Sequence, residues 1–216
     1  MIIMQTLDAV ARKKHIQESG LGEVIFEHMA AYGESVCIQY HPKGFAGGVI
    51  PELDSHIITP LNPDPLGEPF SLWHACGPDS THARYSAIMR RNSDLRLLGV
   101  SLRVKAGGDV QDAGKQWEET FGVTWAMTGD RAVVKFTNAE MSFVPLKAAA
   151  DVEGITEITI GVLGQARLSE ILWRAAHEDL LVNKTPGSNI VHMLGINWRF
   201  HLLDSEIGFT SVASRL

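Results

Sequence analysis

The chain has 216 residues, 45% of them hydrophobic and 20% charged, and its formal net charge is -6. This length allows one large or two small domains around a full hydrophobic core. A sequence pI near 5.8 argues against nucleic acid as a partner, because binding to phosphates needs a basic surface.

The N-terminus MIIMQTLDAVARKKH lacks the basic-then-apolar order of a signal peptide, and no apolar run approaches the ~20 residues that span a bilayer. We therefore expect a cytoplasmic protein with no membrane partner. The two cysteines, Cys37 and Cys76, lie far apart and form no CxxC motif. This spacing favours reduced thiols over a disulfide framework or a zinc ribbon.

The first 94 residues predict a mixture of helix and loop. Apolar spacing predicts helix over residues 5–33, in two pieces separated at Ser19 and Gly20. ESVCIQYHP, residues 34–42, predicts a strand. The Pro- and Gly-rich stretch 44–79 predicts a long surface loop, and THARYSAIMRRN, residues 81–92, predicts a short helix.

From Leu95 the pattern becomes regular. LLGVSLRV predicts a strand, and DVQDAGKQWEETF predicts a helix with Asp109 as its N-cap and Gly122 just past its end. Three short alternating segments follow, VTWAM, RAVVKF and AEMSFVPL, separated by the turns TGD and TNA. The order then starts again with a strand, ITEITIGV, a helix, ARLSEILWRAAHEDLL, and the strand region IVHMLGINWRFHLL, broken by Gly195. A repeated supersecondary unit of this kind is a fold-level signal.

This doubled β-α-β-β-β unit has GVSLRV and EITIGV as first strands and a last strand ending GINWRFHLL. It resembles the vicinal oxygen chelate superfamily, which includes glyoxalase I and extradiol dioxygenases, over about residues 95–204. The resemblance implies an α+β fold in which two units, 95–150 and 151–204, form a curled, cup-shaped mixed sheet with helices outside. Residues 1–94 would precede it as a less regular helical and loop region, either a lid or a degenerate unit. Residues 205–216 would form a tail.

One face of the predicted cup strands is polar. In the last strand, Trp198 and Phe200 belong to an apolar face, and Asn197, Arg199 and His201 lie opposite. The first strand of each unit repeats this alternation. The expected lining residues are Ser101, Arg103, Ser142, Glu157, Thr159, Asn197, Arg199 and His201. A solvated antiparallel sheet would alternate in the same way, so both interpretations stay open.

The resemblance also implies where a metal would bind: the first and last strands of each unit, through His, Gln or Glu. Those positions are Gly99, Ser142, Glu157 and His201 here, and only the last two can bind a metal. A catalytic divalent site needs three protein ligands, so a third would have to come from the N-terminal half. We expect either no cofactor or one divalent metal, Fe or Zn, with Glu157, His201 and His56 as ligands.

Two stretches of the N-terminal half carry further candidates. PELDSH places Glu52, Asp54 and His56 at alternate positions, on one side of the backbone if it is extended. These could be metal ligands, an acid/base group, or surface residues with a turn at Asp54 and Glu52 facing solvent. In SLWHACG, Trp73 and His74 are candidate substrate contacts; the alternative is a Trp that pins the loop to the core beside a structural His.

Three functions stay open. The first is a small-molecule enzyme of the isomerase, lyase or cyclase type, acting on an oxygenated, partly apolar metabolite. Glu157 and His201 would exchange protons and Arg199 would stabilise a developing oxyanion. The substrate would be bound by Arg103, Ser101, Thr159, Asn197, Trp73 and His74. The second function is a metal-dependent ring-cleaving dioxygenase or lyase, and the third is a non-catalytic protein that binds a small molecule. Association into a homodimer is a further expectation.

Overall fold

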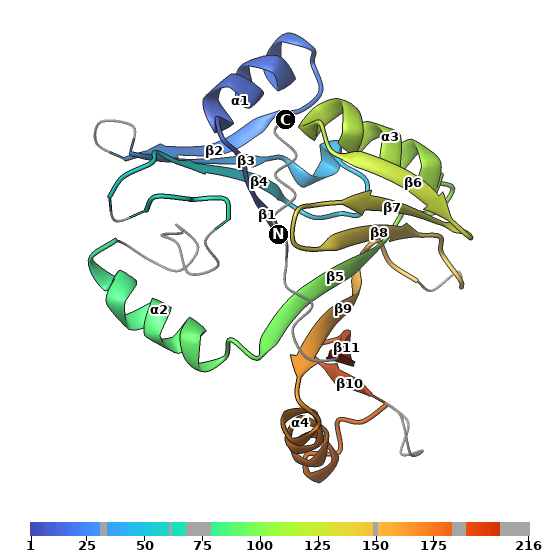
Figure 1. The fold of residues 1–216 in the computed structure, drawn as a ribbon. Coiled ribbons are helices and arrows are strands. Elements are labelled where there is room, and N and C mark those ends of the chain that lie inside the picture. Colours follow the sequence, from blue (N-terminus) through green and yellow to red (C-terminus); the bar gives the residue numbers. More distant parts are fainter. Residues whose placement is uncertain (31–33, 61, 68–78, 149–150, 183–188, 204–216) are drawn as a thin grey trace. The chain divides into compact units, whose positions relative to one another are not determined.

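The computed structural model describes residues 1–30, 34–60, 62–67, 79–148, 151–182 and 189–203. The chain divides into two compact units, Met1–Asn92 and Ser93–Leu216, each built on a mixed β-sheet (Figure 1). None of the described helices is long and apolar enough to cross a membrane.

The first unit is a strand, a helix and three strands, followed by a further helix. Its elements are β1 (Ile2–Gln5), α1 (Ala9–Glu18), β2 (Val24–Met29), β3 (Ser35–Tyr40), β4 (Pro51–His56) and α2 (His82–Arg91), with 3-10 turns at Pro42–Gly44 and Asp79–Thr81. The sheet order is β1-β4-β3-β2, in which β1 is parallel to β4 and the other neighbours are antiparallel. Helix α1 lies along one side of this sheet (Figure 1), and Ile16 is buried with Ile38 and Leu53 in that core.

Two expectations for this unit are wrong. Residues 24–29 form strand β2 and not a second helical piece, because Val24, Ile25 and Phe26 are β-branched or aromatic and the segment pairs with β3 through Val24 and Phe26–Met29. The predicted loop 44–79 contains strand β4, which lies between β1 and β3. The predicted strand at 34–42 and the predicted helix at 81–92 are confirmed as β3 and α2.

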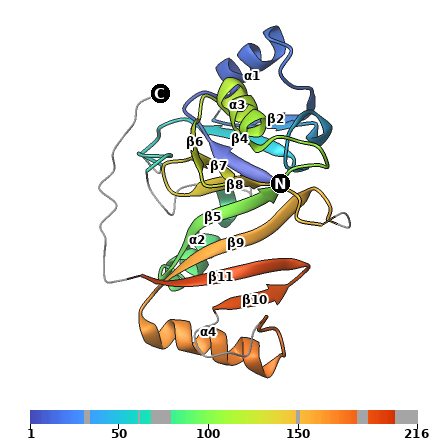
Figure 2. The ribbon, with the colours of Figure 1, turned by 90° about the vertical axis from the view of Figure 1, so that its right-hand side faces the viewer.

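The second unit holds the two predicted repeats, and every element expected after Leu95 is confirmed. These elements are β5 (Leu95–Arg103), α3 (Val110–Phe121), β6 (Thr124–Thr128), β7 (Arg131–Lys135), β8 (Glu140–Val144), β9 (Gly154–Leu163), α4 (Gln165–His177), β10 (Ile190–Met193) and β11 (Ile196–Leu203). They form one sheet in the order β10-β11-β9-β5-β8-β7-β6 (Figure 2). The two repeats meet where β5 and β9 pair antiparallel along nearly their whole length.

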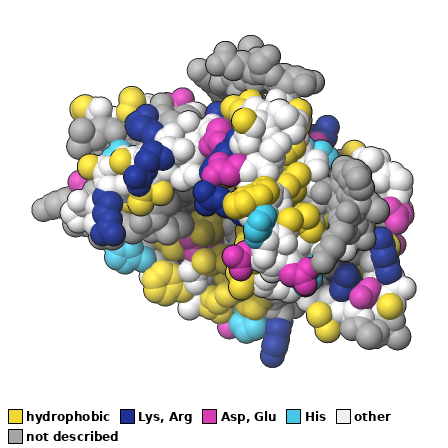
Figure 3. Space-filling view, turned by 90° about the horizontal axis from the view of Figure 1, so that it is seen from below, with side chains coloured by type: hydrophobic (Ala, Val, Ile, Leu, Met, Phe, Trp, Pro, Cys, Tyr) yellow, Lys and Arg dark blue, Asp and Glu magenta, His cyan; other side chains and the backbone are white. Residues whose placement is uncertain are grey.

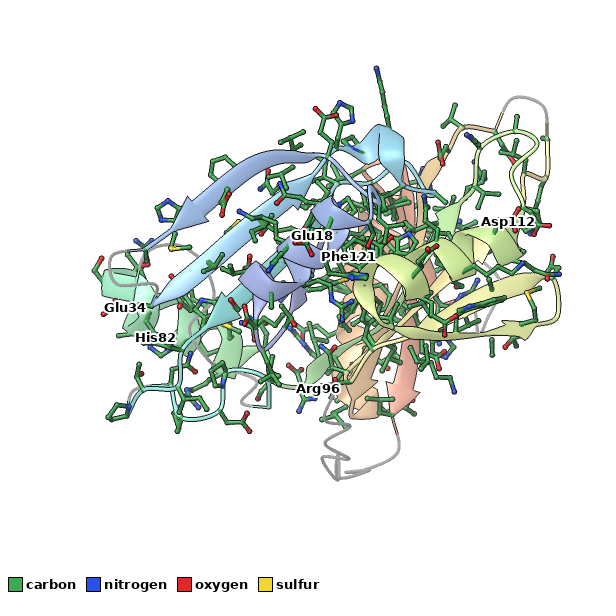
Figure 4. All side chains as sticks on the ribbon, turned by 90° about the horizontal axis from the view of Figure 1, so that it is seen from above. Glu18, Glu34, His82, Arg96, Asp112 and Phe121 are labelled. Carbon is green, nitrogen blue, oxygen red and sulfur yellow. The ribbon has the colours of Figure 1, made fainter. Side chains whose placement is uncertain are left out.

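Helix α3 shows how the local sequence sets these elements. Asp109 caps its start by accepting a hydrogen bond from the backbone N–H of Gln111 at 2.7 Å. Gly122 ends it at φ 71°, a left-handed conformation that favours glycine. Between them, Trp117 is fully buried, with ring centroids 5.0 Å from Phe121 and 5.9 Å from Phe143 of β8. Figure 4 labels Phe121 toward the end of α3 and Asp112 toward its start.

Helix α4 packs against β9 and β11 through the buried residues Leu168 and Ala175. Its outer side keeps Trp173 exposed, with the ring 3.9 Å from that of His177. Hydrophobic side chains also reach the surface beside acidic and basic ones in the space-filling view from below (Figure 3).

The chain contains three strand-helix-strand repeats, one in the first unit and two in the second, and they share one feature. The first strand of each is parallel to its last: β1 to β4, β5 to β8, and β9 to β11. The first unit therefore carries the same strand order as the predicted repeats. In the described residues, the repeat that begins at β9 has two strands after its helix, whereas the repeats that begin at β1 and β5 have three strands each.

Candidate functional site

The predicted cup-lining residues of the second unit share one face of its sheet. Directly paired residues point to the same side, and the register sets Ser101 opposite both Ser142 and Glu157. Glu157 in turn lies opposite Asn197, and Thr159 lies opposite Arg199. The other face carries the buried apolar side chains under the helices, among them Leu102, Met141, Phe143 and Val162.

Glu157 and Arg199 form an ion pair with two hydrogen bonds on this polar face. Arg199 donates from Nε to Oε1 at 2.9 Å and from Nη2 to Oε2 at 2.8 Å. The side chains are 19% exposed for Glu157 and 39% for Arg199. These hydrogen bonds raise the pKa of Arg199 further above its ordinary value. A two-point contact of this kind fixes the plane of the guanidinium and leaves the N–H groups of Nη1 outside the pair.

Smaller contacts hold the other candidates. The hydroxyls of Ser101 and Ser142 lie 3.2 Å apart. Asn197 Oδ1 lies 3.0 Å from His192 Nδ1 on the neighbouring strand β10. Arg103 lies 3.3 Å from Asp151, which links it to the connection that leads from β8 to β9.

Asp151 is itself held by backbone donors. Its Oδ2 accepts hydrogen bonds from the N–H groups of Lys147 at 2.9 Å and Ala148 at 3.0 Å. These bonds, and then the charge of Arg103, hold the pKa of the Asp151 carboxyl below its usual value. The predicted substrate contact Arg103 is thus already engaged by this connection.

His201 lies away from Glu157. It pairs with Gly161, whereas Glu157 pairs with Asn197, four residues earlier on β11. At the rise of a β-strand this separates the two positions by about 13 Å along the sheet. The structure therefore brings Arg199, and not His201, to Glu157.

The donor set that the resemblance implies for a metal is not assembled in the described part of the second unit. Both Glu157 oxygens contact Arg199, and among the described residues of this unit no group of three potential ligands converges there. His56 belongs to the first unit, where its Nδ1 lies 3.3 Å from Gln5 Nε2. Trp73 and His74 lie outside the described residues, so their roles stay predictions.

The first unit holds a cluster of potential metal ligands, of which sequence patterns predicted only the two carboxylates. Glu52 and Asp54 lie on β4, and Cys37 lies opposite Asp54 on β3. One ligand atom from each of these three side chains lies within 4.8 Å of the other two. Cys37 is 6% exposed, Glu52 3% and Asp54 0%. The expectation of a turn at Asp54 with Glu52 facing solvent is therefore wrong, because both residues belong to a central, covered strand.

The environment of Cys37 keeps its thiol protonated. Burial, followed by the charges of Asp54 and Glu52 and their hydrogen bonds, raises its pKa to about 12. Next to it, Gln39 Nε2 donates to Glu52 Oε2 at 2.5 Å. Sequence patterns alone did not single out Cys37 as a ligand. The alternation of Ser35, Cys37 and Gln39 matches that of Glu52, Asp54 and His56, but the pairing of the two strands does not follow from either stretch alone.

Comparison with known proteins rests on structure alone. No family model matches the chain, and no curated protein matches it. A hypothetical protein from Staphylococcus aureus is similar at a TM-score of 0.53 and 12% identity, covering 94% of this chain and 64% of that one. A catechol 2,3-dioxygenase is similar at a TM-score of 0.52 and 13% identity, covering 94% and 68%.

A 2,2',3-trihydroxybiphenyl 1,2-dioxygenase from Sphingomonas wittichii strain RW1 is similar at a TM-score of 0.51 and 11% identity, covering 93% of this chain and 69% of that one. The chain thus spans about two thirds of the length of these proteins. Identities at this level carry the fold and no activity. Together with the three strand-helix-strand units, they show that the chain has the vicinal oxygen chelate fold that its sequence resembles.

Proposed function

We propose that the protein is a small-molecule enzyme of the isomerase, lyase or cyclase type, which binds an oxygenated, partly apolar metabolite on the polar face of the second unit. One observation carries the proposal: Glu157 holds Arg199 by two hydrogen bonds of 2.9 and 2.8 Å on that face. A guanidinium fixed in advance stabilises a developing oxyanion without having to reorganise during the reaction.

Each residue has a stated task in this proposal. Arg199 binds the oxyanion through Nη1, and Glu157 is the positioning residue that orients it. The hydroxyls of Ser101 and Ser142, 3.2 Å apart, supply further hydrogen bonds to substrate oxygens. His201 is the proposed proton carrier at the far end of the same face, since imidazole can both donate and accept a proton. The apolar part of the metabolite would be bound by the less polar positions of the face, such as Val133 of β7.

Binding and turnover of a small panel test this proposal: catechol, benzoate, phenylpyruvate and 2-oxobutyrate. Dissociation constants come from calorimetry, and products from NMR of each mixture. Arg199→Lys keeps the charge but loses the two-point contact with Glu157, so we expect it to weaken binding of a carboxylate or phenolate by about tenfold or more. Glu157→Gln should weaken binding less, through loss of orientation.

Arg174→Lys is the matched control. Arg174 also pairs with a glutamate, Glu170 at 2.6 Å, but does so on the surface of α4. The Arg174→Lys protein should bind every compound in the panel with the same dissociation constant as the wild type. Equal binding by Arg199→Lys and the wild type would contradict the proposal. Tight binding without turnover, unchanged in His201→Ala, would assign the protein to the non-catalytic binders instead.

A ring-cleaving dioxygenase is the competing function. It would need iron bound by a converging donor set, and Glu157 and His201 do not converge in the second unit. Iron content of the purified protein, measured beside activity after chelation, separates the two functions: activity that depends on iron would overturn the metal-free proposal.

A further inference from the structure

The buried cluster of the first unit is a set of metal-ligating groups that the proposed function does not use. Cys37 and Asp54 are directly paired across β3 and β4, and Glu52 lies two positions from Asp54 on the same face. Their ligand atoms lie within 4.8 Å of one another. Three side chains from two adjacent strands therefore converge on one point.

Burial makes this arrangement unusual. Two carboxyl groups and a thiol are at most 6% exposed, so water solvates them little. The side-chain amide of Gln39, which donates to Glu52, is a neutral group. Buried charges are costly unless an opposite charge or a metal compensates them. A divalent cation at the centre of the cluster would compensate both carboxylates at once.

We propose that Cys37, Glu52 and Asp54 bind a zinc ion. A thiolate with two carboxylates is a mixed sulfur and oxygen donor set, which suits zinc better than magnesium or calcium, since those ions take oxygen ligands alone. Donors around tetrahedral zinc lie about 3.5 Å apart, given Zn–S near 2.3 Å and Zn–O near 2.1 Å. The groups of the cluster, within 4.8 Å of one another, therefore have to close by about 1.3 Å at most, which side-chain rotation allows.

Zinc binding at this cluster has a proton signature. A ligating cysteine must be a thiolate, so metal binding at this cluster is coupled to loss of the thiol proton. Zinc would also tie β3 to β4 and stabilise the first unit by mass action. The inference concerns the first unit only and does not depend on the proposed function.

The test uses the full chain, freed of metal with a chelator and titrated with Co²⁺ or Zn²⁺ alone. Cobalt bound by a thiolate gives a charge-transfer band in the near ultraviolet, which oxygen ligands do not produce. The chain has only two cysteines, so Cys76→Ser leaves Cys37 as the sole source of such a band. We expect one equivalent of Co²⁺, with the band present in the wild type and in Cys76→Ser, and its loss on addition of Zn²⁺.

Three further variants sharpen the result. Cys37→Ser should lose the band, and Glu52→Gln should weaken zinc binding by about 100-fold. Gln39→Leu, which removes the amide beside Glu52, should weaken it by about tenfold, as is usual for groups that orient a ligand. Absence of the band in the wild type, or its loss in Cys76→Ser, would overturn the inference. Because Cys76→Ser leaves the cluster intact, these two measurements decide the matter even if the cluster variants fail to fold.

Discussion

The thiol of Cys37 should be almost unreactive in the metal-free native protein. Its pKa is raised from 9.0 to about 12, mainly by burial and then by Asp54 and Glu52. At pH 8 the thiolate fraction therefore falls by about 1000-fold relative to the unfolded chain, at tenfold per pKa unit. Alkylation by iodoacetamide, followed at Cys37 by peptide mass spectrometry in native and in denatured protein, measures the ratio directly.

The pH profile separates the raised pKa from simple shielding. With a pKa near 12, the native alkylation rate should keep rising about tenfold per pH unit from pH 8 to 11. Shielding alone would leave a slow rate that levels off above pH 9. A plateau near pH 9 would therefore refute the argument that the two carboxylates and burial control this thiol.

The same shift affects stability. Because the folded pKa of Cys37 lies above the unfolded value of 9.0, the folded protein holds this proton more tightly. The contribution to stability is complete below pH 9 and is lost as the pH rises toward 12, by up to about 4 kcal/mol. Burial raises the pKa of Tyr40 as well, which acts in the same direction. Urea unfolding of the metal-free protein at pH 8 and pH 11 should show roughly two thirds of this loss, since pH 11 still lies below the folded pKa.

Two predictions concern the scaffold of the second unit. Trp117→Ala should destabilise it by about 3 to 5 kcal/mol in urea unfolding, because the fully buried indole packs on Phe121 and Phe143; a loss below 1 kcal/mol would contradict that packing. Asp109→Ala should lower the free energy of unfolding by about 1 kcal/mol through loss of the N-cap of α3. The control Asp112→Ala removes an exposed pair with Lys115 at 3.6 Å and should change stability by less than about 0.5 kcal/mol. Equal effects of the two substitutions would show that the cap contributes nothing.

Local sequence patterns were sufficient to predict the helices and strands of the second unit, because the caps and the apolar alternation of each element match the structure that it adopts. Asp109 and Gly122 mark the two ends of α3, and the alternation of Trp198 and Phe200 against Arg199 marks the two faces of β11. The first unit was harder to predict because tertiary pairing decides between competing local patterns. Val24, Ile25 and Met29 fit helical spacing, but hydrogen bonding to β3 makes the segment a strand.

The candidate site divides in the same way. That Glu157 and Arg199 share a polar face follows from alternation within each strand, whereas their pairing depends on the parallel register of β9 and β11. A shift of this register by four residues would instead have placed His201 opposite Glu157. Likewise, the alternation in PELDSH predicts that Glu52 and Asp54 share one face, but Cys37 joins them only through the antiparallel register of β3 and β4. Register is a long-range property, which one stretch of sequence does not carry.

The hydrogen-bonded ladder between β5 and β9 makes the second unit suitable for division into two polypeptides. Backbone hydrogen bonds join its two halves along Leu95–Arg103 and Gly154–Val162, while the chain joins them only by the connection from Val144 to Gly154. The covalent link and the ladder are thus separate ties between the same two halves. A gene cut within that connection would yield two polypeptides, one with β5 and the other with β9 as a newly unpaired edge strand complementary to the other, and therefore a natural pair for split-protein complementation.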